Sequence, residues 1–295
     1  MKKITVFTPT YNRAYTLPQL YNSLVRQTNQ NFIWLIIDDG SSDNTKELIE
    51  QWKDENKIII EYLYQENQGM HGAHNTAYKN IDTELNVCID SDDYMPDNAI
   101  EIILSFWKEK GNKDVAGIVG LDANKNGKII GTSIPNNIKE SSLNDLYYKN
   151  NVKGDKKLVL RTEVVKKYPA YPIFEEEKFV PLGYLYNLID QDYKLLTLNK
   201  VLCVVEYLED GSSLNILNQY RKNPKGFAFS RVARMKNPNS LVELIKNSIH
   251  YVSSSIFTKN IHFLNDSPKK LITFLVIPFG ILLNVYIRFK TRNNE

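Results

Sequence analysis

Three carboxylates lie within four residues, directly after an apolar segment that runs from Leu85 to Ile89. The apolar run predicts a buried strand. Because side chains alternate along a strand, Asp90 and Asp92 would share one face and Asp93 would point to the other. Carboxylates this close repel one another, and a divalent cation with oxygen ligands relieves the repulsion. The cluster predicts a metal site; the alternative is that Asp92 and Asp93 only begin a loop and cap the helix after Pro96.

The chain before this cluster alternates between strand and helix patterns. Short β-rich runs occupy residues 4–8, 32–37 and 58–64, and apolar residues at helical spacing mark segments around 16–25, 48–52 and 73–78. Strands separated by helices of this length favour right-handed crossovers and a mainly parallel sheet. Ligands of such sheets bind at the carboxyl ends of the strands. The expected fold class is therefore α/β, with flanking helices.

Polar residues follow each of the four predicted strands. In chain order, they are Thr8, Thr10, Asn12 and Arg13, then Asp38 and Asp39, then Gln65, Asn67 and Gly69, and finally Asp90, Asp92 and Asp93. A carboxylate at the second strand end could accept hydrogen bonds from a base or ribose, while aspartates at the fourth could hold a cation against a diphosphate. Each loop taken alone is an ordinary turn, as Asp39-Gly40 illustrates. All four together predict one ligand-binding crevice.

These four segments, in this order, resemble the signatures of family 2 glycosyltransferases of the GT-A fold, a Rossmann-like fold. The resemblance covers Ile4 to Gly211 and implies a nucleotide-diphosphate-sugar donor with a bias to UDP, a divalent metal, Mn²⁺ or Mg²⁺, and inversion at the anomeric carbon. The donor-binding residues it implies are Thr8, Pro9, Thr10, Tyr11, Arg13, Asp38, Asp39, Asn67, Gly69, His74, Asn75, Asp90 and Ser91. It assigns the metal to Asp92, helped by Asp90 or Asp93. One departure is Met70, where many relatives carry lysine.

An acidic turn downstream offers the general base that inverting transfer requires. Glu175, Glu176 and Glu177 are consecutive and lie between two prolines. Mutual repulsion would raise the pKa of at least one of them. The resemblance to the family favours Glu177 as the catalytic residue, with Glu176 second; the alternative is a solvated acidic turn. The segment from Tyr207 to Ser213 resembles a family loop that closes the active site.

Two further groups of residues have a functional and an ordinary interpretation. His71 and His74 are three residues apart and could be metal ligands, although the aspartates already suffice. Arg221, Lys222 and Lys225 could approach the diphosphate or could simply coat a helix. Cys88 and Cys203 each lie in an apolar run, which predicts reduced, buried thiols.

Composition and charge divide the chain into two regions. Its 295 residues, 42% hydrophobic and 24% charged, suit one large α/β domain with an appendage. From Leu214 onward, Lys and Arg number 13 against 3 Asp and Glu, which leaves 24 against 31 before it. We therefore expect a GT-A domain over residues 1–213 and a basic helical region over 214–295. The amino terminus has no secretory h-region, so a cytoplasmic protein is expected.

The basic region contains an apolar segment, residues 271–287, with lysines before it and Arg288, Lys290 and Arg292 after it. Seventeen residues barely span a bilayer, and the Pro-Phe-Gly near the middle should break the helix. Two helical halves lying on an anionic membrane surface are expected, with the protein peripheral at the inner face of the plasma membrane. The alternative is a helix buried against the catalytic domain or in a homo-oligomer interface. Nucleic acid is disfavoured as a partner because the segment is apolar.

The sequence as a whole predicts a metal-assisted glycosyltransferase that acts on a glycan or lipid-linked glycan acceptor in the synthesis of a bacterial cell-surface polysaccharide or glycoconjugate. One alternative is a catalytically silent sugar-nucleotide-binding or scaffold protein. Another is a nucleotidyltransferase, which normally shows a glycine-rich basic loop after its first strand. The segment from Thr8 to Arg13 contains no glycine.

Overall fold

The computed structural model describes residues 2–206 and 215–292, which form two compact units. The sheet unit consists of residues 2–170 and 188–206, and the helical unit consists of residues 171–187 and 215–292. The predicted domain boundary between residues 213 and 214 lies outside the described residues, as does the predicted closing loop from Tyr207 to Ser213. The short segment 171–187, which carries the acidic turn, belongs to the helical unit.

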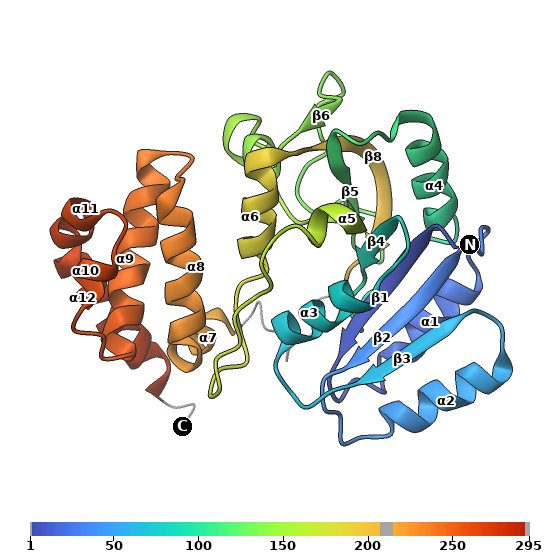
Figure 1. Ribbon diagram of the computed structural model, residues 1–295, viewed down its shortest axis with the longest axis horizontal. Helices are drawn as coiled ribbons and strands as arrows, with labels where there is room; N and C mark the ends of the chain where they lie inside the picture. Colours follow the sequence, from blue (N-terminus) through green and yellow to red (C-terminus); the bar gives the residue numbers. More distant parts are fainter. Residues whose placement is uncertain (1, 207–214, 293–295) are drawn as a thin grey trace. The chain divides into compact units, whose positions relative to one another are not determined.

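Strands and helices alternate along the first half of the sheet unit (Figure 1). The elements up to residue 204 are β1 (Ile4–Thr10), α1 (Leu17–Val25), β2 (Phe32–Asp38), α2 (Thr45–Glu55), β3 (Ile60–Tyr64), α3 (Met70–Asn80), β4 (Leu85–Cys88), α4 (Ala99–Lys110), β5 (Val115–Ala123), β6 (Glu140–Ser141), β7 (Lys156–Arg161), α5 (Thr162–Val165), α6 (Gly183–Asp192) and β8 (Lys194–Val204). A single π-helical turn, Asp145–Lys149, precedes β7. The predicted strands and helices of the first 90 residues are confirmed.

The eight strands form one sheet in the order β3-β2-β1-β4-β7-β5-β8-β6. The predicted parallel arrangement is confirmed for β3, β2, β1 and β4. Strand β7 runs antiparallel between β4 and β5, β8 is parallel to β5, and the short β6 is antiparallel to β8. The complete sheet is therefore mixed, and its four parallel strands direct four carboxyl ends to one edge.

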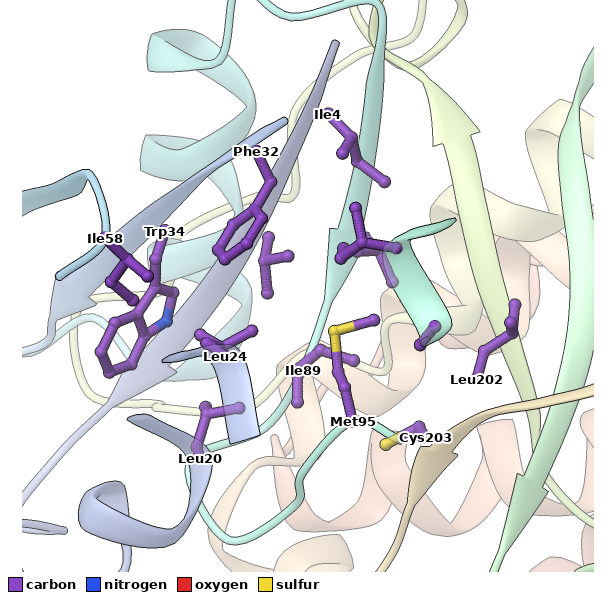
Figure 2. Packing of buried hydrophobic residues seen from close by; sticks show 14 of the residues in the cluster. Ile4, Leu20, Leu24, Phe32, Trp34, Ile58, Ile89, Met95, Leu202 and Cys203 are labelled. Atoms are coloured by element: carbon purple, nitrogen blue, oxygen red, sulfur yellow. The ribbon is translucent and has the colours of Figure 1, made fainter. Parts of the chain in front are cut away.

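Alternation along β1 divides its side chains between the two faces of the sheet. Ile4 and Val6 join a large core with residues of α1, α2 and α4, part of which is shown in Figure 2. Within this core, Tyr21 stacks on Trp52 with ring centroids 4.3 Å apart. Phe7 points to the opposite face, where it packs against the rings of α3. Helices on both faces bury the sheet and fix the strand ends.

The helical unit has a much smaller core. Its helices are α7 (Ile216–Lys222), α8 (Pro224–Lys236), α9 (Leu241–Phe257), α10 (Phe263–Asp266), α11 (Lys270–Leu275) and α12 (Ile277–Lys290). Met235, Leu244 and Tyr251 form one buried apolar cluster. The predicted break in the apolar segment is confirmed, because α11 ends at Leu275 and α12 begins two residues later with Pro278 in its first turn. Among the described residues, no helix is both long and apolar enough to span a membrane.

Two glycines of the sheet unit share a positive φ but differ in their surroundings. Gly117 lies in β5 with φ +148°, and a Cβ there would lie 2.0 Å from the carbonyl oxygen of Val159 on β7. Gly127 lies in a turn with φ +76°, and no atom would lie within 4 Å of its Cβ. Both positions favour glycine by conformation, but only Gly117 also needs the space.

We expect Gly117→Ala to lower the free energy of unfolding of the sheet unit by more than about 3 kcal/mol, since it adds a clash with the backbone to the conformational cost. Gly127→Ala should cost about 1 kcal/mol. Urea unfolding followed by tryptophan fluorescence measures both, because Trp34, Trp52 and Trp107 all lie in the sheet unit. Equal losses for the two variants would contradict the steric argument.

Candidate active site

The carboxyl ends of β1, β2 and β3 lie side by side. In the sheet register, Thr10 pairs with Asp38, and Asp38 pairs with Tyr64. The ladder continues one residue beyond the strands: the backbone N–H of Asp39 donates to the carbonyl of Thr10 at 2.8 Å, and that of Gln65 donates to the carbonyl of Asp38 at 2.9 Å. Three of the four predicted loops therefore begin from adjacent positions.

The carboxylate of Asp39 organises the loop after β3. Its Oδ1 accepts from the Gln65 side chain at 2.7 Å and from the Gln68 backbone at 2.8 Å. Its Oδ2 accepts from the backbone N–H of Gly69 at 2.7 Å. Gly69 has φ +82° and directly precedes α3, a conformation that glycine adopts readily. The buried carboxylate of Asp39 thus holds Gly69, the second predicted donor residue, next to it.

Asp38 has a similar role in the turn after β2. The hydroxyl of Tyr62 donates to its Oδ2 at 2.7 Å, and the backbone N–H of Ser41 donates to its Oδ1 at 2.8 Å. Burial, together with the Asp38 charge, raises the pKa of Tyr62 well above its ordinary value. Gly40, with φ +90°, allows the turn to approach Asn67, whose backbone nitrogen would lie 3.0 Å from a Cβ at Gly40. The second and third loops therefore pack directly against each other.

The loop after β1 is held against the same turn by Asn12. This residue has φ +52°, and its side-chain oxygen accepts from the backbone of Ser42 at 2.7 Å. Asparagine tolerates such a conformation better than most residues do. Tyr11 is half exposed at this loop, and the guanidinium of Arg13 lies over the ring of Tyr15. An aromatic ring and a cation are thus presented at the end of β1.

The threonines of β1 are turned into the protein. The indole nitrogen of Trp34 donates to Thr8 Oγ1 at 3.0 Å, so the Thr8 side chain anchors the core. Pro9 is buried in the strand, and the buried hydroxyl of Thr10 has no hydrogen-bond partner among the described residues. Thr8 is fully buried, and its predicted contact with a donor stays a prediction.

The carboxylates after β4 have different environments. Asp90 and Asp92 are partly exposed, whereas Asp93 is buried. Asp93 Oδ1 accepts from the backbone N–H of Glu206 at 3.2 Å, and the thiol of Cys203 lies 3.6 Å from its Oδ2. Burial raises the pKa of Asp93 to about 8, with a further contribution from the charges of Asp90 and Asp92. Asp93 thus faces the protein, whereas Asp90 and Asp92 are partly exposed.

The described residues contain no group of three or more His, Cys, Asp or Glu side chains arranged to hold a metal ion. Magnesium and similar cations are commonly held by one or two carboxylates, with water and substrate phosphates as the other ligands. Asp90 and Asp92 fit such a site, which the diphosphate of a donor would complete. Asp93 is buried, and its oxygens lie near the backbone N–H of Glu206 and the thiol of Cys203, so its part in such a site stays a prediction.

His74 lies in α3, where its interactions extend toward Asp90. Its Nδ1 is 3.3 Å from the hydroxyl of Tyr78, and its Nε2 is 3.6 Å from the sulfur of Cys88, which lies 3.6 Å from Asp90 Oδ1. Burial lowers the pKa of His74 to about 4, although the charge of Asp90 opposes the shift. A neutral imidazole whose nitrogens both contact the protein is a positioning group. This geometry gives no support to His74 as a metal ligand, and the same interpretation of His71 stays untested.

Two residues beside this cluster, partly buried Lys157 and buried Asp122, were missing from the sequence-based prediction. Lys157, on β7, donates to the carbonyl of Cys88 at 3.4 Å. Burial lowers its pKa, but the charges around it, including those of Asp122, Asp90 and Asp93, raise it above its ordinary value. Asp122, near the end of β5, is itself buried. Lys157 supplies a positive charge next to these carboxylates. It comes close to them because β7 pairs with β4, and no local sequence pattern connects these two strands.

The remaining predicted donor residues occupy the same part of the sheet unit. Asn75 is partly buried on α3, and Ser91 is buried between Asp90 and Asp92. Met70 begins α3 and is exposed, which places the residue that departs from the family pattern at the surface. Their contacts with a donor stay a prediction.

The predicted base lies in the helical unit, where it meets the first turn of α8. Glu177 is buried, and its two oxygens accept from the backbone N–H groups of Lys225 and Gly226, each at 2.8 Å. Burial raises the pKa of Glu177, and these two hydrogen bonds partly oppose the rise. Gly226 has no room for a side chain, because a Cβ would lie 2.2 Å from the carbonyl of Phe179. The Glu176 side chain is 84% exposed, with its carboxylate 3.8 Å from the ammonium of Lys225.

The three basic residues that the sequence singled out lie at the end of α7 and in the first turn of α8. Arg221 donates to the carbonyl and hydroxyl oxygens of Thr291, each at 3.1 Å, and so ties α7 to the end of α12. Lys222 and Lys225 are exposed. Of the two interpretations of Arg221, these hydrogen bonds support the one that places it on a helix surface.

The fold is an α/β sheet with carboxylates at its strand ends, and comparison with known proteins places the chain in a family. The sequence profile described as glycosyl transferase family 2 matches residues 5–168, more than half of the chain. The chain therefore belongs to glycosyl transferase family 2.

Similar proteins include two with different extents of match. An uncharacterized glycosyltransferase of Rickettsia conorii is 38% identical over 107 residues, which cover 36% of this chain and 17% of that protein. The poly(ribitol-phosphate) beta-N-acetylglucosaminyltransferase TarP of Staphylococcus aureus is 26% identical over 227 residues, which cover 73% of this chain and 67% of TarP. The match to the Rickettsia protein thus spans about a sixth of that relative's length.

Two solved structures share the fold over almost the whole chain. The complex of S. aureus TarS residues 1–349 with UDP-GlcNAc has a TM-score of 0.61 at 18% identity and covers 99% of this chain and 92% of that one. The mannosyltransferase PcManGT of Pyrobaculum calidifontis, in complex with GDP-Man and Mn2+, has a TM-score of 0.56 at 13% identity and covers 96% of this chain and 87% of that one. At these identities the likeness concerns the fold, and the expected GT-A class is confirmed.

The lowered pKa of His74 predicts a loss of stability in mild acid. Between pH 6.5 and 4, the unfolded chain binds a proton at this histidine and the folded chain does not, so stability falls as pH falls through this window. From pH 7 to 5, we expect the wild type to lose about 2 kcal/mol more unfolding free energy than His74→Gln. Urea unfolding at the two pH values measures this.

His262→Gln, at an exposed position of the helical unit, is the matched control and should keep the pH dependence of the wild type. If His74→Gln shows the same loss as the wild type, the buried neutral imidazole is not the cause.

Proposed function

We propose that this chain is an inverting glycosyltransferase that transfers a sugar from a nucleotide-diphosphate-sugar to an acceptor hydroxyl of a cell-surface polysaccharide or glycoconjugate. The observation that carries the proposal is the convergence of the β1, β2 and β3 ends around Asp39, in the same sheet as β4, which the partly exposed Asp90 and Asp92 follow. Membership in the family supports the same reaction class.

UDP-GlcNAc is the first donor to test. The name of TarP specifies N-acetylglucosaminyl transfer, and the TarS structure contains UDP-GlcNAc. PcManGT binds GDP-Man, so a panel must include guanosine donors as well. An acceptor with the chemistry of a poly(ribitol phosphate) is a reasonable first choice on the same ground.

The chain's own residues would divide the work between donor binding and proton transfer. Tyr11 and the loop that Asp39 holds would contact the nucleotide, and Asp92 with Asp90 would hold a divalent cation. When bound, that cation would neutralise the charge that develops on the leaving diphosphate. The acceptor oxygen forms a bond to the anomeric carbon as the bond to the diphosphate breaks, and the hydroxyl proton passes to a carboxylate of the acidic turn, with Glu177 the first candidate.

A product assay tests the proposal against both alternatives. With a radiolabelled donor and an acceptor panel, sugar transfer together with released nucleoside diphosphate is expected. In a parallel reaction that contains a nucleoside triphosphate and a sugar 1-phosphate instead of the donor, released pyrophosphate would identify a nucleotidyltransferase. Tight donor binding without transfer to any acceptor or to water would identify a binding protein.

Asp92→Asn should abolish metal-dependent donor binding while leaving the thermal midpoint of the free protein nearly unchanged. A ligand at about 100 times its dissociation constant stabilises a protein by about 2.7 kcal/mol. We expect UDP-GlcNAc with Mn²⁺ to raise the wild-type midpoint by the corresponding amount, and expect this shift to vanish in Asp92→Asn or with a chelator.

Asp97→Asn is the matched control, because Asp97 lies five residues away and its carboxylate pairs with Arg26 at the surface. It should keep the full shift. A shift in Asp92→Asn equal to that of the wild type would exclude Asp92 as a metal ligand.

Glu177→Gln should lower both turnover and stability. The amide of glutamine cannot accept both backbone N–H groups of α8, so about 1–3 kcal/mol of unfolding free energy should be lost. Loss of the base should reduce turnover at saturating donor by roughly 100-fold to 10000-fold, with donor affinity retained. Chemical unfolding, steady-state kinetics and donor titration measure the three quantities.

Glu176→Gln and Glu175→Gln alter the neighbouring exposed carboxylates and should change neither stability nor turnover by more than about threefold. If Glu177→Gln loses stability alone, its role is to hold α8 and the base lies elsewhere. If Glu176→Gln alone loses turnover, Glu176 is the base.

A further inference from the structure

Helices α11 and α12 expose a dense set of large apolar side chains. Of the twenty large hydrophobic residues exposed in the described part of the chain, nine fall within residues 271–289. They are Leu271, Phe274, Leu275, Phe279, Ile281, Leu282, Val285, Tyr286 and Phe289. Contiguous apolar surface of this kind is rare on a protein surrounded by water and marks a surface that another phase or molecule covers. We call these nine residues the apolar face.

The inward side of the same two helices is small and polar. Gly280 packs on α9 so closely that a Cβ would lie 2.4 Å from Cγ1 of Val252. Buried Asn284 donates to the carbonyl of Ser253 at 3.0 Å. Buried Thr273 shares a 2.7 Å hydrogen bond with Ser267. Two apolar residues, Val276 and Ile287, complete the buried set of this segment. The usual pattern of a surface helix, apolar inside and polar outside, is therefore reversed.

Helix α9, against which α12 packs, continues this pattern (Figure 1). Ser248 and Ser255 are buried, and each hydroxyl donates to the carbonyl four residues earlier at 2.8 Å. Asn247 is also buried and accepts from Arg231 at 2.9 Å. Small residues and interhelical hydrogen bonds are the means by which helices associate where lipid, rather than water, surrounds them.

The charge around the apolar face has one sign. Residues 267–294 contain five Lys and Arg and no Asp or Glu. Lys270 stands at the start of α11, and Lys290 and Arg292 stand at the end of α12, all exposed. The guanidinium of Arg288 lies over the ring of Phe257, with its carbon 4.8 Å from the ring centroid. A two-fold pairing of this face with itself would bring like charges together, whereas anionic headgroups complement them.

The dimensions of these helices place them in the plane of a bilayer surface. Helix α12 has 14 residues, so it is about 21 Å long at about 1.5 Å per residue, shorter than the roughly 30 Å of a hydrocarbon core. The helix is interrupted at Val276, between α11 and α12. Helices with one apolar and one polar side lie at the depth of the headgroups and insert their apolar side chains.

We propose that the apolar face of α11 and α12 binds the surface of a bilayer that contains anionic lipid. The apolar side chains enter the interface, and the lysine and arginine residues at the two ends of the helical pair contact the headgroups. This attachment would keep the enzyme at the inner face of the plasma membrane, close to a lipid-linked acceptor.

The test is co-sedimentation of the full chain with vesicles, without donor or acceptor. Vesicles of phosphatidylglycerol and phosphatidylcholine should bind the protein, and phosphatidylcholine vesicles should bind it at least tenfold less tightly. The combined variant Phe279→Ser, Leu282→Ser and Phe289→Ser should lose at least tenfold in affinity for the anionic vesicles. These side chains are exposed, so the fold should be retained, as circular dichroism and the thermal midpoint can establish.

Leu241→Ser with Val242→Ser is the matched control, since both residues are exposed in the same unit but lie on α9. It should bind vesicles like the wild type. Lys270→Gln with Lys290→Gln should weaken binding to anionic vesicles and reduce its dependence on salt.

Two results would overturn the proposal. One is the absence of wild-type binding to anionic vesicles at millimolar lipid, or undiminished binding of the triple serine variant. The other is an oligomer, measured by light scattering, that the triple variant converts to a monomer while vesicles bind neither protein; a second copy of the chain would then cover the face. Since no donor is present, either result leaves the proposed transferase activity to its own assay.

Discussion

The sheet unit depends on the burial of negative charge at the carboxyl ends of its strands. Asp38, Asp39 and Asp122 are buried there, and Asp93 is buried with a raised pKa that favours its neutral form near pH 7. An unpaired buried carboxylate costs several kcal/mol, so each needs hydrogen-bond donors or a cation. The donors come from loops that follow neighbouring strands, and Lys157 provides the cation from a strand far along the chain. Satisfying these groups therefore determines where the loops lie.

This requirement separates two kinds of aspartate in the candidate site. Those whose oxygens are occupied by the chain form a framework, whose positions are held by the pairing of β1 with β2 and β4. Asp90 and Asp92 are partly exposed, and Asp90 lies next to Cys88, which in turn contacts His74. A ligand with positive charge or hydrogen-bond donors would meet groups already in position, which reduces the entropy lost on binding.

The parts of the molecule that depend on local pattern could be predicted from the sequence. The alternation of strands and helices and the polar strand ends followed from apolar periodicity. Side-chain direction could not: Thr8 turns to Trp34 because alternation along β1 places it on the core face. Lys157 was missed because its pairing with the β4 region joins residues about seventy positions apart. Glu177 meets the backbone of α8 through a tertiary contact that composition cannot indicate.

The reversed pattern of α11 and α12 also affects the heat capacity of the helical unit. Unfolding raises heat capacity because apolar groups become hydrated, on average by about 12–15 cal/mol/K per residue. Fourteen large apolar side chains in the described part of this unit are already exposed in the folded chain, so unfolding in water adds less apolar hydration than usual. The stability of the helical unit should therefore vary with temperature along a flatter curve than that of the sheet unit, and cooling should weaken it less.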